Sequence, residues 1–175
     1  MALITAFTSA ATDERTDIVR MLAEQRDIVL ISVRGLDDAQ AAARSTVSDL
    51  TLGGIVKHLA KGHRTWTHIM TGQPGTPDGM WDTGQYYLAE GDTLAGLLAE
   101  YAAAARATEE AVLSLPDLDR TVPLPEAPWA PGVVDRWSRR RILLQLLRET
   151  AQHAGHADII RESLDGANTT AQLGT

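Results

Sequence analysis

Apolar residues recur with the period of an α-helix in four separate segments of the chain, and no segment shows the convincing apolar–polar alternation of a β-strand. Asp92 precedes the third segment as an expected N-cap, and Pro116 ends it. Gly35 and Gly166 are the expected stops of the first and the fourth segments. The predicted helices cover approximately residues 13–35, 49–72, 93–115 and 138–164.

Two long connections rich in glycine and proline separate these helices, over residues 73–91 and 116–137. Loops longer than about 12–15 residues are uncommon in compact domains and are often functional. The aromatic side chains in these loops indicate either the aromatic entrance of a ligand-binding site or apolar residues that cover the ends of a helix bundle. Five of the eight aromatic residues lie there: Trp81, Tyr86, Tyr87, Trp129 and Trp137.

Four long helices without strands predict an all-α fold, a four-helix bundle with long crossover loops. A chain of 175 residues has the size of one domain, so we expect residues 1–175 to form a single one. The content of 44% hydrophobic and 22% charged residues is that of a globular protein, which excludes wholesale disorder.

The charge balance narrows the class of partner. The sequence has 16 basic and 23 acidic residues and a net charge of −7, whereas a general binder of nucleic acid or of an anionic membrane needs clustered positive charge. No run approaches the ~18 apolar residues of a transmembrane helix, and the first residues lack the basic start of a secretory signal. The sequence therefore predicts a cytoplasmic protein that binds neither nucleic acid nor membrane.

The fourth predicted helix carries polar residues on the face that should be buried. Because each residue of an α-helix turns by about 100°, Glu149, His153 and His156 stand on one face. Ile142 lies seven residues before Glu149, and Ile160 lies seven after His153, so this face is also the apolar one. Burying these groups unpaired costs on the order of several kcal/mol. A divalent cation would pair with them, and since the sequence has no cysteine, only His, Asp or Glu can hold it.

Helical spacing alone leaves the set of ligands open. Glu149 with His153, or His153 with His156, could share an ion, and Glu149 with His153 could equally form an ion pair without metal. His58, on the flank of the buried face of the second helix, is the candidate ligand from another helix, and Gly62 leaves space beside it. Two imidazoles and a carboxylate suit Zn, Ni, Fe or Mn, and three protein ligands leave open positions, as catalytic sites do.

Two motifs give the sequence a resemblance to a known family. The stretch LTLGGIVKHLAKGHRTW, followed about ninety residues later by LLRETAQHAGHADIIRESLDG, resembles the DinB-like superfamily. The closest branch contains mycothiol-dependent S-transferases and the N-terminal domain of mycothiol-dependent maleylpyruvate isomerase. The resemblance extends from the first helix to the GHADIIRE segment. It implies a four-helix bundle that holds one divalent metal between the second and fourth helices.

Carried over residue by residue, the resemblance assigns the metal ligands to His58, Glu149 and His153. His156 then stands just beyond the ligands, supporting one of them or facing the substrate. Asp158 and Arg161 follow on the same helix as candidate substrate-binding residues, and Arg161 could meet a carboxylate of a substrate. Their spacing also suits a surface ion pair between the two. No residue is assigned a catalytic role.

The function implied is that of a metal-dependent transferase with a role in detoxification. A low-molecular-weight thiol, mycothiol, would be activated as a metal-bound thiolate, with zinc the expected metal, and would attack an electrophilic small molecule. The absence of cysteine is consistent with this, because the nucleophile arrives with the cosubstrate. The sequence ends ten residues after Asp165, without the further domain of the isomerase, so we do not expect isomerase activity on maleylpyruvate.

Two other functions would use the same ligands. A non-catalytic, metal- or ligand-binding stress-response bundle would show no thiol-dependent turnover. A metal-dependent hydrolase would hold water at the open position and would need no thiol. An exposed face of the bundle would suit a homodimer.

Overall fold

A computed structural model describes residues 13–173, so the prediction about a secretory signal at the first residues lies outside the described part. All four predicted helices are present, each within three residues of its expected bounds. The all-α four-helix bundle is therefore confirmed. The long helices are α2 (Glu14–Ser32), α4 (Leu52–Thr71), α5 (Leu94–Ser114) and α6 (Arg139–Asp165).

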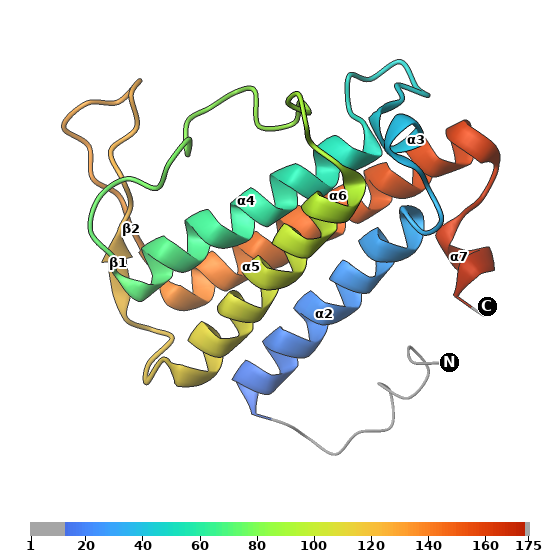
Figure 1. Cartoon of the computed structure of the whole chain (residues 1–175). Helices are drawn as coiled ribbons and strands as arrows, with labels where there is room; N and C mark the ends of the chain where they lie inside the picture. The colour runs from blue at the N-terminus through green and yellow to red at the C-terminus, as the bar shows by residue number, and fades with distance from the viewer. Residues whose placement is uncertain (1–12, 174–175) are drawn as a thin grey trace.

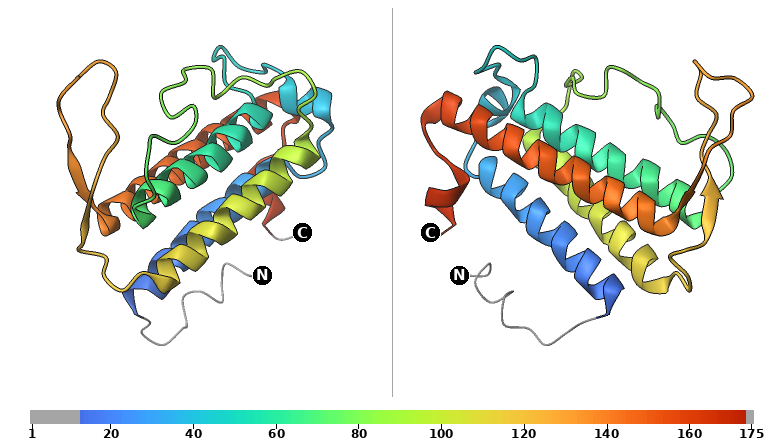
Figure 2. Two further views of the ribbon diagram at one scale, coloured as in Figure 1. Left: turned by 60° about the vertical axis from the view of Figure 1, so that its left-hand side comes forward. Right: turned by 180° about the vertical axis from the view of Figure 1, so that it is seen from behind.

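The four helices surround a common core (Figures 1 and 2). Helix α4 packs against α5 and α6, and α2 packs against the same two helices, so the order around the bundle is α2–α6–α4–α5. The connection between α4 and α5 passes over the outside of α4 (Figure 1). No helix within residues 13–173 combines the length and the apolar character needed to cross a membrane.

Capping residues explain where the helices begin and end. The hydroxyl of Ser138 accepts a hydrogen bond from the backbone of Arg141 at the start of α6, and Gly166 ends α6 with a φ of +80°. The prediction that Asp92 caps α5 is wrong. Thr93 is the N-cap, because its hydroxyl accepts from the backbone of Gly96, while the Asp92 carboxylate pairs with a lysine of α4.

Four short elements were not predicted. Strands β1 and β2 form an antiparallel hairpin inside the predicted loop 116–137. Each strand has three residues, which is too short for an alternation of apolar and polar positions to be recognised. The short elements are α3 (Asp38–Ala42), β1 (Thr121–Pro123), β2 (Arg136–Ser138) and α7 (Thr169–Gln172).

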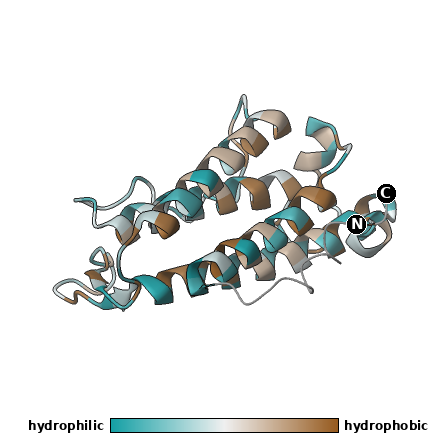
Figure 3. Ribbon diagram, turned by 90° about the horizontal axis from the view of Figure 1, so that it is seen from below, coloured by the Kyte–Doolittle hydropathy of each residue, from teal (hydrophilic) through white to brown (hydrophobic). Residues whose placement is uncertain are grey.

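The apolar core is divided into two clusters along the bundle axis, with apolar residues on the facing sides of the helices (Figure 3). One cluster lies near α3 and α7, and the other lies near the β-hairpin. On α4, α5 and α6, buried polar residues stand between the two clusters. This polar layer positions the candidate site. The residues of the polar layer include His63 and Thr65 on α4, Thr108 on α5, and Thr150 and His153 on α6.

Candidate metal centre

The structure brings His58 of α4 together with Glu149 and His153 of α6. One donor atom from each lies within 4.8 Å of the others. Nε2 of His58 is 3.6 Å from Oε2 of Glu149, and Nε2 of His153 is 3.8 Å from the same oxygen. The two histidines are only 9% and 4% exposed, and Glu149 is half-buried. His58 thus meets two residues that lie about ninety positions later in the sequence, at the interface of two packed helices.

The carboxylate of Glu149 is held in a defined orientation. Its Oε1 accepts hydrogen bonds from Nε2 of Gln145 and from a guanidinium nitrogen of Arg148, each at 2.9 Å. These bonds leave Oε2 directed to His58 and His153. One oxygen of Glu149 is therefore free to act as a ligand.

Burial lowers the pKa of both imidazoles. For His153, burial together with the nearby His58 and His156 lowers the pKa to about 4, although Glu149 opposes the change. For His58, burial also lowers the pKa against the opposing effect of Glu149. Burial disfavours the charged form of Glu149, but the hydrogen bond from Arg148 and the two imidazoles outweigh it, so its pKa lies below the usual value. Near pH 7 the group offers two neutral imidazoles and one carboxylate.

This set of donors fits a divalent cation. Two imidazole nitrogens and a carboxylate oxygen are ligands of zinc and of neighbouring transition metals. All three side chains are in the protonation state that donates to a metal. Three protein ligands also leave room for a further donor.

His156 lies beside the group and faces His153. The Nδ1 atoms of the two histidines are 3.3 Å apart, and their ring centroids are 5.3 Å apart. A ligating histidine commonly uses its second nitrogen in such a contact, which orients the ring. The position of His156 suits support of His153.

Tyr86, from the loop between α4 and α5, completes the group. Its hydroxyl oxygen lies 3.2 Å from Nε2 of His58 and 3.4 Å from Nε2 of His153. Its ring stacks on the ring of His58 with centroids 4.1 Å apart. A Cβ atom on Gly54 would lie 2.1 Å from the backbone oxygen of Tyr86, so only glycine allows this approach. The one sequence signal for Tyr86 is its place among the aromatic residues of a long loop.

A pocket of about 440 Å³ opens beside the three candidate ligands. His58, Glu149 and Tyr86 line its polar part. Such a volume lies within the range of small-molecule sites. The apolar part of the wall comes from Trp66, Met80, Trp81, Leu124 and Trp137.

The aromatic residues of the two long loops differ in their surroundings. Three of the five line the pocket, whereas Tyr87 and Trp129 are 58% and 73% exposed. The ring of Trp137 stacks on that of Trp66 at 5.4 Å, and the guanidinium of Arg141 lies 4.1 Å from the Trp137 ring. This stack both forms a wall of the pocket and covers the apolar cluster near the hairpin, so elements of both interpretations are present.

His63 also lines the pocket and takes part in the buried polar layer. Its Nδ1 lies 2.9 Å from the hydroxyl of Thr108, which lies 2.8 Å from the hydroxyl of Thr67. Burial lowers the pKa of His63 to about 4, and its side chain is 3% exposed. His63 is therefore a neutral, hydrogen-bonded core residue near pH 7.

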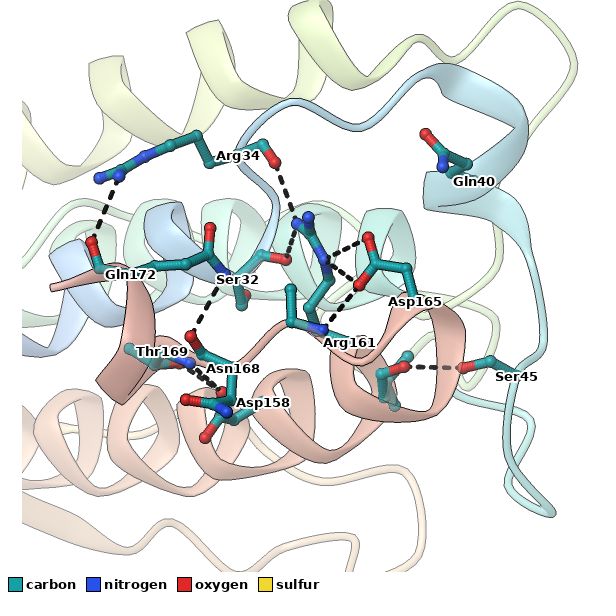
Figure 4. A network of polar contacts seen from close by, with 12 residues as sticks. Ser32, Arg34, Gln40, Ser45, Asp158, Arg161, Asp165, Asn168, Thr169 and Gln172 are labelled. Carbon is teal, nitrogen blue, oxygen red and sulfur yellow. Dashed lines mark hydrogen bonds and ion pairs between the residues drawn. The ribbon is translucent and has the colours of Figure 1, made fainter. Parts of the chain in front are cut away.

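Asp158 and Arg161 are not brought to the pocket but join elements at the other end of the bundle (Figure 4). The buried guanidinium of Arg161 donates at 3.0 Å to the backbone carbonyls of Ser32 and Arg34. It also pairs with Asp165 at 2.9 Å. The carboxylate of Asp158 accepts from the backbone N–H and the hydroxyl of the first residue of α7. These contacts replace the surface ion pair between the two residues that their spacing allowed.

Comparisons with known proteins agree with this architecture. The profile of a family described as Mycothiol-S-transferase matches residues 17–166. A solved structure, described as the conserved protein of locus from Enterococcus faecalis, is similar to the chain with a TM-score of 0.63. That similarity covers 90% of this chain and 100% of the other at 14% identity, so it concerns the fold alone. No match to a curated protein was found.

Proposed function

Because the chain belongs to the mycothiol S-transferase family, we propose that it transfers a low-molecular-weight thiol, mycothiol, to an electrophilic small molecule. The observation that carries this proposal is the convergence of His58, Glu149 and His153, of which His58 and Glu149 also line a pocket. These three side chains would hold a single divalent cation, with zinc the expected ion. A cation at this place would favour the thiolate form of the cosubstrate at neutral pH.

The surrounding residues have defined tasks in this reaction. The negative charge of Glu149 would partly neutralise a bound cation, which would keep the sulfur of the thiol nucleophilic. Gln145 and Arg148 fix the carboxylate through its other oxygen. His156 holds the ring of His153. Nothing in this arrangement requires a nucleophile from the protein, which has no cysteine.

The pocket wall indicates the character of the second substrate. Trp66, Trp81 and Trp137 offer an apolar surface next to the polar end of the pocket. An electrophile with an apolar body would displace water from these rings while its reactive carbon faces the thiol. We therefore propose an apolar electrophile.

The test has a binding arm and a turnover arm. Elemental analysis of the purified protein should find one metal ion per chain, and the His58→Ala variant should lose it. Zinc-loaded protein should conjugate mycothiol to a model electrophile, and the His153→Ala variant should be slower by at least about a hundredfold, since it lacks a ligand. Gln152→Ala, an exposed position next to His153, is the matched control and should react like the parent.

Three results would contradict the proposal in different ways. A His153→Ala variant that conjugates as fast as the parent would exclude the role of the metal. Metal binding without any thiol-dependent turnover would identify a non-catalytic binding protein. Turnover of the electrophile that needs no thiol would identify a hydrolase.

A further inference from the structure

Starting from the metal site proposed above, we infer that the hydroxyl of Tyr86 is a fourth, displaceable donor to the cation. In the metal-loaded protein without thiol, this hydroxyl would occupy one corner of the coordination tetrahedron, the position that the thiol needs. Binding of the thiol would then require Tyr86 to give up that corner.

The distances between donor atoms support this assignment. Zinc binds nitrogen and oxygen at about 2.0–2.1 Å, so two donors at neighbouring corners of a tetrahedron lie about 3.3 Å apart. The hydroxyl oxygen of Tyr86 is 3.2 Å and 3.4 Å from the Nε2 atoms of His58 and His153. Oε2 of Glu149 is 3.6 Å and 3.8 Å from the same two nitrogens. Tyr86 thus approaches both imidazoles at least as closely as the third candidate ligand does.

Contacts with α4 hold Tyr86 at this place. Its backbone carbonyl lies against Gly54, one helical turn before His58, on whose ring it stacks. The next residue of the loop, Tyr87, accepts a hydrogen bond from Nζ of Lys57 through its backbone oxygen at 3.0 Å. Three neighbouring residues of α4 therefore position the loop, so the approach of the hydroxyl to the two histidines is built into the fold.

The hydroxyl is also suited to be displaced. A neutral phenol oxygen is a weak donor, whereas a thiolate is a soft ligand that zinc prefers. In the exchange, the phenol leaves with its proton, and the thiol releases its own proton to solvent as sulfur takes the corner. No bond of the protein is broken in this step.

Competition for one corner has a measurable signature. The hydroxyl of Tyr86 adds to the affinity of the protein for the cation. It reduces the affinity of the metal-loaded protein for the thiol, because in part of the molecules the hydroxyl occupies the coordination position that the thiol needs. Removing the hydroxyl should therefore change the two affinities in opposite directions. Loss of a merely structural contact would weaken both.

The experiment compares Tyr86→Phe with Tyr87→Phe, the same change at the adjacent, exposed position. Zinc affinity is measured by competition with a chelator, and mycothiol affinity by calorimetry on zinc-loaded protein. In Tyr86→Phe, zinc should bind about fivefold more weakly and mycothiol about fivefold more tightly, the factor expected for one interaction of hydrogen-bond strength. Tyr87→Phe should alter neither affinity.

Other outcomes overturn the inference in distinguishable ways. If the parent binds no zinc, the proposed metal site and the role of Tyr86 both fail. If the parent binds zinc but Tyr86→Phe binds it equally well, only the fourth donor fails, and the proposed function stands. If both affinities fall in Tyr86→Phe, the tyrosine positions the site without competing for the corner.

Discussion

Gly54 is the position at which the packing of the loop on α4 can be tested most sharply. A Cβ atom there would lie 2.1 Å from the backbone oxygen of Tyr86, and contacts below 3.0 Å are essentially never seen. In Gly54→Ala, the carbonyl must therefore retreat by about 1 Å. A backbone atom cannot rotate aside as a flexible side chain can.

The expected cost follows from this overlap. Overpacking by one methyl group costs about 1–3 kcal/mol, and alanine regains up to about 1 kcal/mol in a helix. We expect a net loss of about 1–2 kcal/mol in the free energy of unfolding, which lowers the melting temperature by about 2–8 °C for a chain of this size. The hydroxyl of Tyr86 should move with its backbone, so zinc affinity should also fall.

Thermal and urea unfolding of the metal-free protein provide the measurement. Gly155→Ala is the matched control, because Gly155 is exposed on α6 and a Cβ atom there meets nothing within 4 Å. That variant should gain about 0.5–1 kcal/mol from the helix propensity of alanine. If Gly54→Ala proves as stable as Gly155→Ala, the close contact between α4 and the loop does not exist as described.

Three further predictions concern metal, pH and a buried arginine. Zinc at a concentration about a hundred times its dissociation constant should stabilise the parent protein by about 2.7 kcal/mol. Removing the zinc with a chelator should therefore lower the melting temperature of the parent by about 5–10 °C, and it should leave the melting temperature of His153→Ala unchanged. The pKa of His63 lies at about 4 in the folded chain against 6.5 ordinarily, so below pH 6.5 the unfolded chain takes up a proton that the folded chain refuses. Stability of the metal-free protein should therefore fall between pH 6.5 and 4, by up to about 3 kcal/mol from this group, and urea unfolding of His63→Gln should lack that part of the slope. Arg161→Lys should lose about 2 kcal/mol of stability, because lysine cannot reproduce the hydrogen bonds to the backbone carbonyls of Ser32 and Arg34. The KM for mycothiol should be unchanged in this variant. A raised KM would place Arg161 at the substrate.

The long helices could be predicted because each repeats its apolar period over several turns and ends at a recognisable residue, as α6 does at Gly166. The same period placed Glu149, His153 and His156 on one buried face, but it could not decide which two share an ion. The resemblance to the family supplied that choice. In the structure Glu149 and His153 meet His58, while His156 contacts only His153 among them.

The remaining features depend on contacts that leave no periodic signal. Tyr86 reaches the histidines because its backbone meets Gly54, and neither residue shows this in its own segment. The tertiary partners of Arg161 are backbone carbonyls at the end of α2, which any residue type provides. Sequence spacing therefore suggested a surface or substrate contact where the fold uses a buried anchor.

The indole rings around the pocket give the protein a built-in optical reporter. Three of its four tryptophans line that one cavity, and the fourth, Trp129, lies with its ring 5.0 Å from that of Trp81. Nearly all intrinsic emission should therefore originate within reach of a bound molecule. Collections of unlabelled compounds can be screened by quenching alone, so candidate electrophiles can be ranked before any assay of turnover exists.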